Sequence, residues 1–163
     1  MTAVVDIEGF QVKNKFYVKE LAVFNLRDET TKQWIFRSPF PYNSIAVKDK
    51  KTVYHCEKYL HRIRWSRGYT EYNQLQPILS SFANSGDTIY VKGYQKTQYI
   101  RGLLPKSVEI KDLENLNCPK FEELEAVKVE SPCVITSHPD SSHCALRKAV
   151  AFATWLNSRV SYE

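Results

Sequence analysis

The sequence has none of the marks of a membrane or exported protein. It contains no run of about 18 apolar residues, the length that a membrane-spanning helix needs. Residues 1–6 have neither the basic start nor the apolar stretch of a secretory signal. We therefore expect a soluble intracellular protein, cytoplasmic or nuclear, with no membrane partner.

Internal repeats, low-complexity tracts and long linkers are absent as well, which favours a single domain. The chain has 163 residues, close to one ordinary domain and long enough to bury a core. Hydrophobic residues make up 43% and charged residues 25% of the chain, and these values exclude the composition of a disordered protein. We expect one domain over residues 1–163.

Cysteine is scarce, and basic residues outnumber acidic ones. Four cysteines and four histidines fit a reducing compartment better than a disulfide scaffold, and metal ligation is the alternative. The net charge of +5 favours anionic partners such as nucleic acid, although a mildly basic solvated surface explains it equally well.

Short apolar runs near the N-terminus predict three consecutive strands, at residues 4–8, 16–26 and 34–36. The polar segment between the last two favours an antiparallel meander. The period then changes to that of helices at residues 52–61 and 75–82, with a fourth strand at 89–91. Pro119 fits the first turn of a helix carrying Phe121 and Leu124, and residues 146–156 form a closing helix. This order predicts an α/β fold.

The first candidate site is Asp6-x-Glu8 on the first strand. A spacing of two residues places both carboxylates on the same side of a strand, about 6 to 7 Å apart. Carboxylates held in this way can bind a pair of divalent ions that act on a phosphodiester. The alternative is a solvated strand end.

Further motifs follow this strand in a defined order: Glu20-Leu21-Ala22-Val23, His61-Arg62-Ile63, Asp112-Leu113, and residues 143–149 with the sequence His-Cys-Ala-Leu-Arg-Lys-Ala. In this order they resemble the DEDDh-type RNase H-like 3′-5′ exonucleases over nearly the whole chain. The resemblance implies an RNase H-like, exonuclease-type mixed sheet that opens with the antiparallel three-strand meander and has flanking helices. It also makes Asp6, Glu8 and His143 the remnants of a catalytic cleft.

Two positions depart from this family. Lys148 stands where the resemblance implies an aspartate, five residues after His143, and Lys96 stands near the place of another. Each lysine removes an oxygen ligand and adds a positive charge, and two unit charges about 4 Å apart repel by about 4 kcal/mol at an effective dielectric constant of about 20. We therefore expect no catalytic residues and no bound Mg²⁺ or Mn²⁺, with Lys148 in an ion pair with Asp6 or Glu8.

A second candidate site lies in the last third of the chain, where four zinc-type ligands occur: Cys118, Cys133, His138 and Cys144. Thiolate and imidazole are the ligands that zinc prefers, and four of them close a structural site. Buried cysteines without a metal are the alternative. The chain also resembles the Maelstrom domain of the piRNA pathway, which implies zinc ligands at Cys133, His138 and Cys144. Glu57 and His61 are the alternatives to Cys118 as the fourth ligand.

The third feature is a set of basic residues interleaved with aromatic ones. Cations contact phosphates, and aromatic rings can stack on unpaired bases, although the same rings can simply pack in the core. The candidate nucleic-acid contacts are Arg62, Arg64, Arg67, Lys92, Lys96, Arg101, Arg147 and Lys148. Those after residue 90 are expected to border the former cleft.

Together these features predict a catalytically degenerate exonuclease-like module that binds nucleic acid, with single-stranded RNA expected, or a protein partner, or both. A structural zinc would stabilise it. RNA silencing and viral or mobile-element proteins are the contexts that the resemblance suggests. Two alternatives stay open: an active metal-dependent nuclease in which Asp87 or Asp112 replaces a lost ligand, and a purely protein-binding scaffold.

Overall fold

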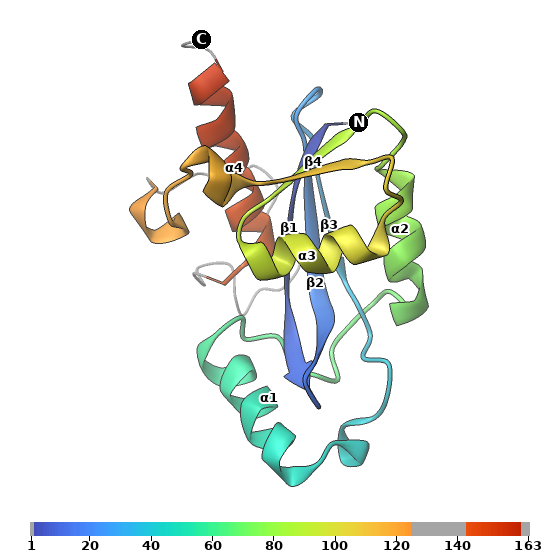
Figure 1. Ribbon diagram of the computed structural model, residues 1–163. Coiled ribbons are helices and arrows are strands. Elements are labelled where there is room, and N and C mark those ends of the chain that lie inside the picture. Colours follow the sequence, from blue (N-terminus) through green and yellow to red (C-terminus); the bar gives the residue numbers. More distant parts are fainter. Residues whose placement is uncertain (1, 125–142, 161–163) are drawn as a thin grey trace.

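The computed structural model describes residues 2–124 and 143–160, which form a five-stranded mixed sheet with four helices (Figure 1). The strands are β1 (Ala3–Val12), β2 (Lys15–Asn25), β3 (Thr31–Ile35), β4 (Thr88–Val91) and β5 (Glu109–Asp112). Their order in the sheet is β3-β2-β1-β4-β5. The first three strands pair antiparallel, whereas β4 and β5 run parallel to β1. The predicted α/β class and opening meander are therefore confirmed.

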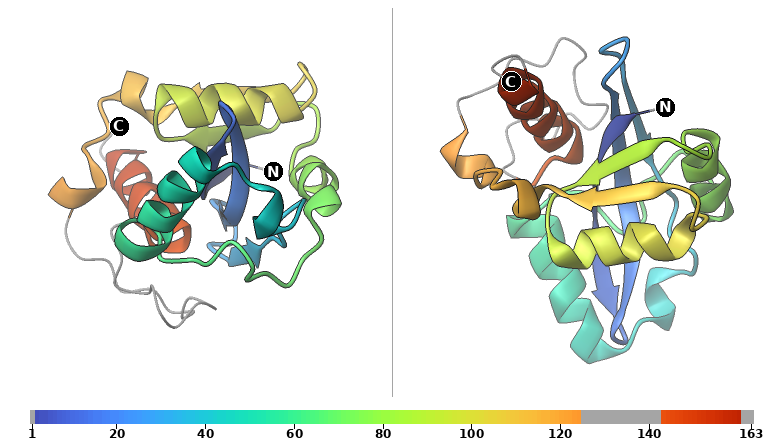
Figure 2. Two further views of the ribbon diagram at one scale, coloured as in Figure 1. Left: turned by 90° about the horizontal axis from the view of Figure 1, so that it is seen from below. Right: turned by 45° about the horizontal axis from the view of Figure 1, so that its top comes forward.

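The helices are α1 (Val47–Tyr59), α2 (Leu75–Ser81), α3 (Tyr94–Leu103) and α4 (Ala145–Val160). Successive strand residues point to opposite faces of a sheet, so the buried runs of β1 and β2 supply two cores. Val5 and Ile7 belong to the core beneath α2 and α3, whereas Val4 packs with Ala149 and Phe152 of α4. Figure 2 shows α3 and α4 on different sides of the sheet.

Helix α1 closes one end of the sheet, where β1 projects beyond β4 (Figure 1). Its buried residues Val53 and Cys56 pack on Phe10 and Val12 of β1, together with Trp65. Among the described residues, no helix is both long enough and apolar enough to cross a membrane.

Strand β1 contains a bulge between Glu8 and Gly9, where the register with β2 shifts. A Cβ atom on Gly9 would lie 2.0 Å from the carbonyl oxygen of Tyr17, so only glycine permits this close approach. The bulge lies directly after the two candidate carboxylates. Asp6, Glu8 and Phe10 are all buried around it.

Four parts of the predicted element order differ from the structure. Helix α3 and strand β5 were not expected, because α3 buries only Thr97 and Ile100 and β5 buries only Ile110, which leaves no apolar period to recognise. The helix predicted from Pro119 is wrong: the described residues form only a 3-10 turn, η4 (Phe121–Glu123), and Leu124 is already extended. Helix α1 begins at Val47, five residues earlier than expected.

Candidate functional site: a neutralised acidic cluster and a basic pocket

Two lysines neutralise the acidic pair on β1. Asp6 is fully buried and Glu8 nearly so. Nζ of Lys96, in the first turn of α3, lies 2.9 Å from Oδ1 of Asp6 and 3.3 Å from Oε1 of Glu8. Nζ of Lys148, from α4, lies 2.9 Å from the same Glu8 oxygen. The predicted ion pair of Lys148 is thus confirmed, and Lys96 joins it.

The protonation of this acidic cluster reflects burial and the two ammonium groups. Burial raises the pKa of Asp6 to about 6, although the adjacent Lys96 acts in the opposite direction. Burial disfavours the charged forms of Glu8 and Lys96 as well, but the opposite charges beside them have the larger effect. The pKa of Glu8 is therefore lowered, and the pKa of Lys96 is raised above its usual range. Burial lowers the pKa of His143, which therefore favours its neutral form. The cluster carries little net charge near neutral pH.

Divalent-ion chemistry would need more oxygen ligands than this cluster offers, because Mg²⁺ requires a near-octahedral oxygen shell. No group of three or more histidine, cysteine or acidic residues that could hold a metal occurs within residues 2–124 and 143–160. Oδ2 of Asp87 accepts from the backbone N–H of Asn84, and Oδ1 of Asp112 accepts from that of Gly93. Asp87 thus bonds the backbone of its own turn, whereas Asp112 bonds the backbone at the start of α3, on another element.

The basic residues expected to border the cleft bind other parts of the protein. Nζ of Lys92 lies 2.5 Å from Oε1 of Glu114 and donates to the carbonyl of Cys118 at 2.8 Å. The guanidinium of Arg101 donates to the carbonyl of Ile110. Lys96 and Lys148 belong to the acidic cluster, and Arg147 is half-buried at the start of α4. The three lysines of this group, Lys92, Lys96 and Lys148, are thus paired with carboxylates within the fold.

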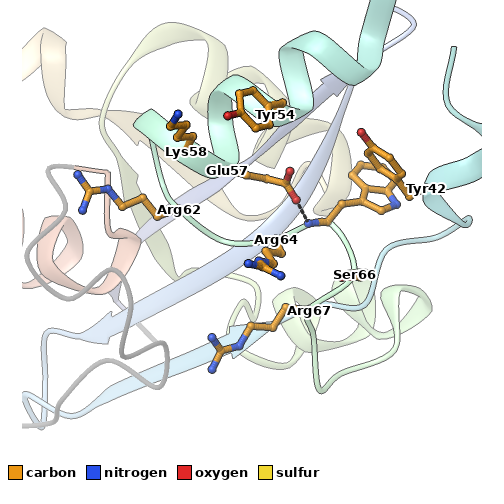
Figure 3. A pocket seen from close by; sticks show the side chains of 9 residues that line it. Tyr42, Tyr54, Glu57, Lys58, Arg62, Arg64, Ser66 and Arg67 are labelled. Carbon is orange, nitrogen blue, oxygen red and sulfur yellow. Dashed lines mark hydrogen bonds between the residues drawn. The ribbon is translucent and has the colours of Figure 1, made fainter. Parts of the chain in front are cut away.

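A different group of cations faces solvent in a pocket of about 920 Å³ (Figure 3). Helix α1 supplies one side, the segment 62–67 supplies the other, and one residue comes from the 3-10 turn η1 (Tyr42–Ser44). The lining residues are Tyr42, Tyr54, Glu57, Lys58, Arg62, Arg64, Trp65, Ser66 and Arg67. The structure therefore brings together Arg62, Arg64 and Arg67, the first three of the predicted nucleic-acid contacts.

The segment that carries the arginines is fixed by its buried residues. His61, Ile63 and Trp65 are buried, whereas Arg62 and Arg64 between them are exposed. His61 holds the start of the segment, because its Nε2 is 3.0 Å from the carbonyl oxygen of Gly9 and its Nδ1 accepts from the N–H of Ile63. The alternation directs the guanidinium groups to the solvent side.

Trp65 lines the pocket and is held by hydrogen bonds to both its backbone and its side chain. Its N–H donates to Oε2 of Glu57 at 2.7 Å, and its indole N–H donates to the carbonyl of Phe40 at 3.0 Å. Its carbonyl accepts from Nζ of the buried Lys19, on β2, at 2.7 Å. Lys19 was missed in the sequence, although the polar pair Lys19-Glu20 inside an apolar strand was a signal.

The charge of the protein is concentrated around this pocket. Residues 41–69 contain seven lysines and arginines and two acids, so this segment alone carries a charge equal to the +5 of the whole chain. The rest of the chain is balanced. The acidic cluster lies in the balanced part.

The proposed zinc ligands are only partly described. Cys118 and Cys144 are buried in the same hydrophobic cluster beneath α4, and burial raises the pKa of the Cys118 thiol to about 11. Cys133 and His138 lie outside the described residues. The alternative ligands Glu57 and His61 instead bond the backbone beside α1.

No family model, curated protein or solved structure matches the chain.

Proposed function

We propose that the protein is a catalytically degenerate exonuclease-like module that binds nucleic acid, with single-stranded RNA as the expected ligand, through the basic pocket beside α1. The RNase H-like interpretation of the sheet is part of this proposal. It is supported by an antiparallel meander followed by two parallel strands, with the acidic pair on the central strand. A protein partner and a structural zinc remain part of the proposal.

The observation that carries the binding function is the pocket. Arg62, Arg64 and Lys58 are exposed cations that can contact successive phosphates, and this contact supplies most of the affinity of non-specific nucleic-acid binding. Tyr42 and Tyr54 are 40% and 54% exposed, so their rings are accessible to unpaired bases. Stacking needs splayed bases, which favours a single strand over a duplex.

The loss of catalysis follows from the acidic cluster. Lys96 and Lys148 place two ammonium groups against Asp6 and Glu8, where divalent ions would have to bind. Two cations in the same place repel a third strongly. The active-nuclease alternative would need these lysines to be displaced, and the scaffold alternative leaves the exposed arginines unexplained.

The test is a fluorescence-anisotropy titration of a labelled single-stranded RNA at several salt concentrations. We expect affinity to fall steeply with salt, and Arg62→Glu with Arg64→Glu to weaken binding at least tenfold at about 0.1 M salt. Lys106→Glu with Lys120→Glu, at exposed positions elsewhere, makes the same change in net charge and serves as the control. The RNA should keep its length when Mg²⁺ is added.

Equal loss of affinity in both double variants would show that net charge, not the pocket, governs binding. Trimming of the RNA from its 3′ end that Asp6→Ala abolishes would establish the active nuclease instead. Absence of RNA binding at low salt would leave the protein-scaffold function.

A further inference from the structure

An acid stands on the wall of the basic pocket. Glu57 comes from α1, and Figure 3 shows it reaching toward the backbone of Trp65. Its Oε2 accepts that N–H at 2.7 Å, while Oε1 makes no hydrogen bond within the described part of the chain. A carboxylate beside three arginines weakens phosphate binding. One oxygen is enough to hold Trp65, so the second oxygen is available to a ligand.

An aromatic ring lies on the same face of the helix. Tyr54 is three residues before Glu57, a spacing that makes two side chains neighbours on a helix. The ammonium of Lys58 lies 5.6 Å from the centre of the Tyr54 ring, so the ring has a cation beside it as well. The pocket therefore offers a flat surface for stacking, an acceptor near that surface, and cations around both. Its volume lies in the range of small-ligand pockets.

This combination matches one class of nucleobase. An ionised carboxylate only accepts hydrogen bonds. Guanine presents two adjacent donors, N1–H and the N2 amino group, on its Watson–Crick edge, whereas uracil presents a single N–H between two carbonyl oxygens that a carboxylate repels. Unpaired bases are commonly recognised on this edge while they stack on an aromatic ring.

We infer that the pocket is a base-reading site that selects an unpaired guanine over uracil, with Glu57 as the acceptor of the guanine donors and Tyr54 as the stacking surface. The neighbouring phosphates lie on Arg62, Arg64 and Arg67. This inference rests on the proposed function, because it requires the pocket to bind a nucleic-acid strand.

The test compares the binding of two labelled 12-nucleotide RNAs, oligouridine and the same oligomer with one central guanine. The protein should bind the guanine oligomer about tenfold more tightly, which is toward the lower end of the discrimination expected of paired hydrogen bonds to a base edge, because Oε1 of Glu57 alone accepts both donors. Glu57→Gln keeps an oxygen that can accept the N–H of Trp65 but loses the charge, and should bind both oligomers equally. Glu122→Gln, at an exposed position, makes the same charge change and should keep the preference.

The outcomes separate the two levels of the proposal. Binding of both RNAs with equal affinity by the unaltered protein overturns the base-reading site and leaves nucleic-acid binding intact. A guanine preference that persists in folded Glu57→Gln overturns the role of Glu57. Failure of both RNAs to bind at low salt overturns the proposed function and the inference with it. The preference of the unaltered protein is itself a test, independent of any variant.

Discussion

At the scale of single residues, Lys19 is the least expected feature of the protein. Its ammonium is buried under the pocket, where it donates to the carbonyl of Trp65 and to Oγ of Ser38. Burial lowers the pKa of Lys19 from 10.5 to about 7, and the charge of Glu57 opposes this only in part. The protein therefore holds a lysine that changes its charge near neutral pH.

This lowered pKa makes stability depend on pH in a defined direction. Above pH 7 the unfolded chain keeps a proton on Lys19 that the folded protein loses, so the free energy of unfolding rises with pH. We predict a rise between pH 7 and 8.5 of at most about 1.4 kcal/mol per pH unit, since one proton is involved. Denaturant unfolding at several pH values measures it. Lys19→Met should remove the rise, and Lys15→Met, exposed on the same strand, should not.

At the scale of elements, the segment that carries the pocket depends on a close backbone contact. A Cβ atom on Gly68 would lie 2.5 Å from the backbone of Phe36 and Arg37. Hydrogen bonds from Tyr69 and Thr70 to the carbonyl of Ile35 fix this contact, so neither side can move away without losing them. Glycine is therefore required at position 68 because there is no room for a Cβ atom, and not because of its backbone conformation, since its φ is not positive.

We predict that Gly68→Ala destabilises the fold by about 1 to 3 kcal/mol, the usual cost of an added atom in a packed site. Gly102→Ala is the matched control, because no atom lies within 4 Å of the added Cβ in α3 and alanine is favoured over glycine in a helix. The melting temperature should fall in the first variant and stay or rise in the second. Similar melting temperatures for the two variants would show that the backbone around Gly68 shifts to accommodate the added Cβ atom at little cost.

Features formed by residues that are close together in the sequence could be predicted, whereas contacts between distant elements could not. The first strands and α4 were predictable because apolar runs mark them in the sequence. The basic cluster was predictable because Arg62, Arg64 and Arg67 are neighbours in the chain. Lys96 was predicted to stand in place of a missing acid and to contact nucleic acid, but its ion pairs with Asp6 and Glu8 were not predicted. Its bonds to Asp6 and Glu8 depend on α3, whose two buried residues, Thr97 and Ile100, give no readable period. Contacts that join distant elements through single polar side chains leave no such pattern.

At the scale of the whole molecule, charge separates the two candidate sites. The acidic cluster is compensated by two lysines, and the excess of positive charge lies in residues 41–69. A polyanion is therefore attracted to the end of the sheet that α1 covers, not to the centre of the sheet. Under the proposed function, the binding site therefore lies away from Asp6 and Glu8.

The last third of the molecule provides the final prediction, which concerns zinc. Cys118 follows β5 and Cys144 precedes α4, and both are buried in one cluster, so a metal that joined them would tie α4 to the segment after β5. A closed site would need Cys133 and His138 as well. We predict about one zinc per chain by elemental analysis, and a lower melting temperature after chelation, because structural metal binding contributes to folding. Cys144→Ser should lose the zinc, whereas Cys56→Ser, a buried cysteine in the core beside α1, should retain it. Metal-free protein with an unchanged melting temperature would show instead that these cysteines are ordinary core residues.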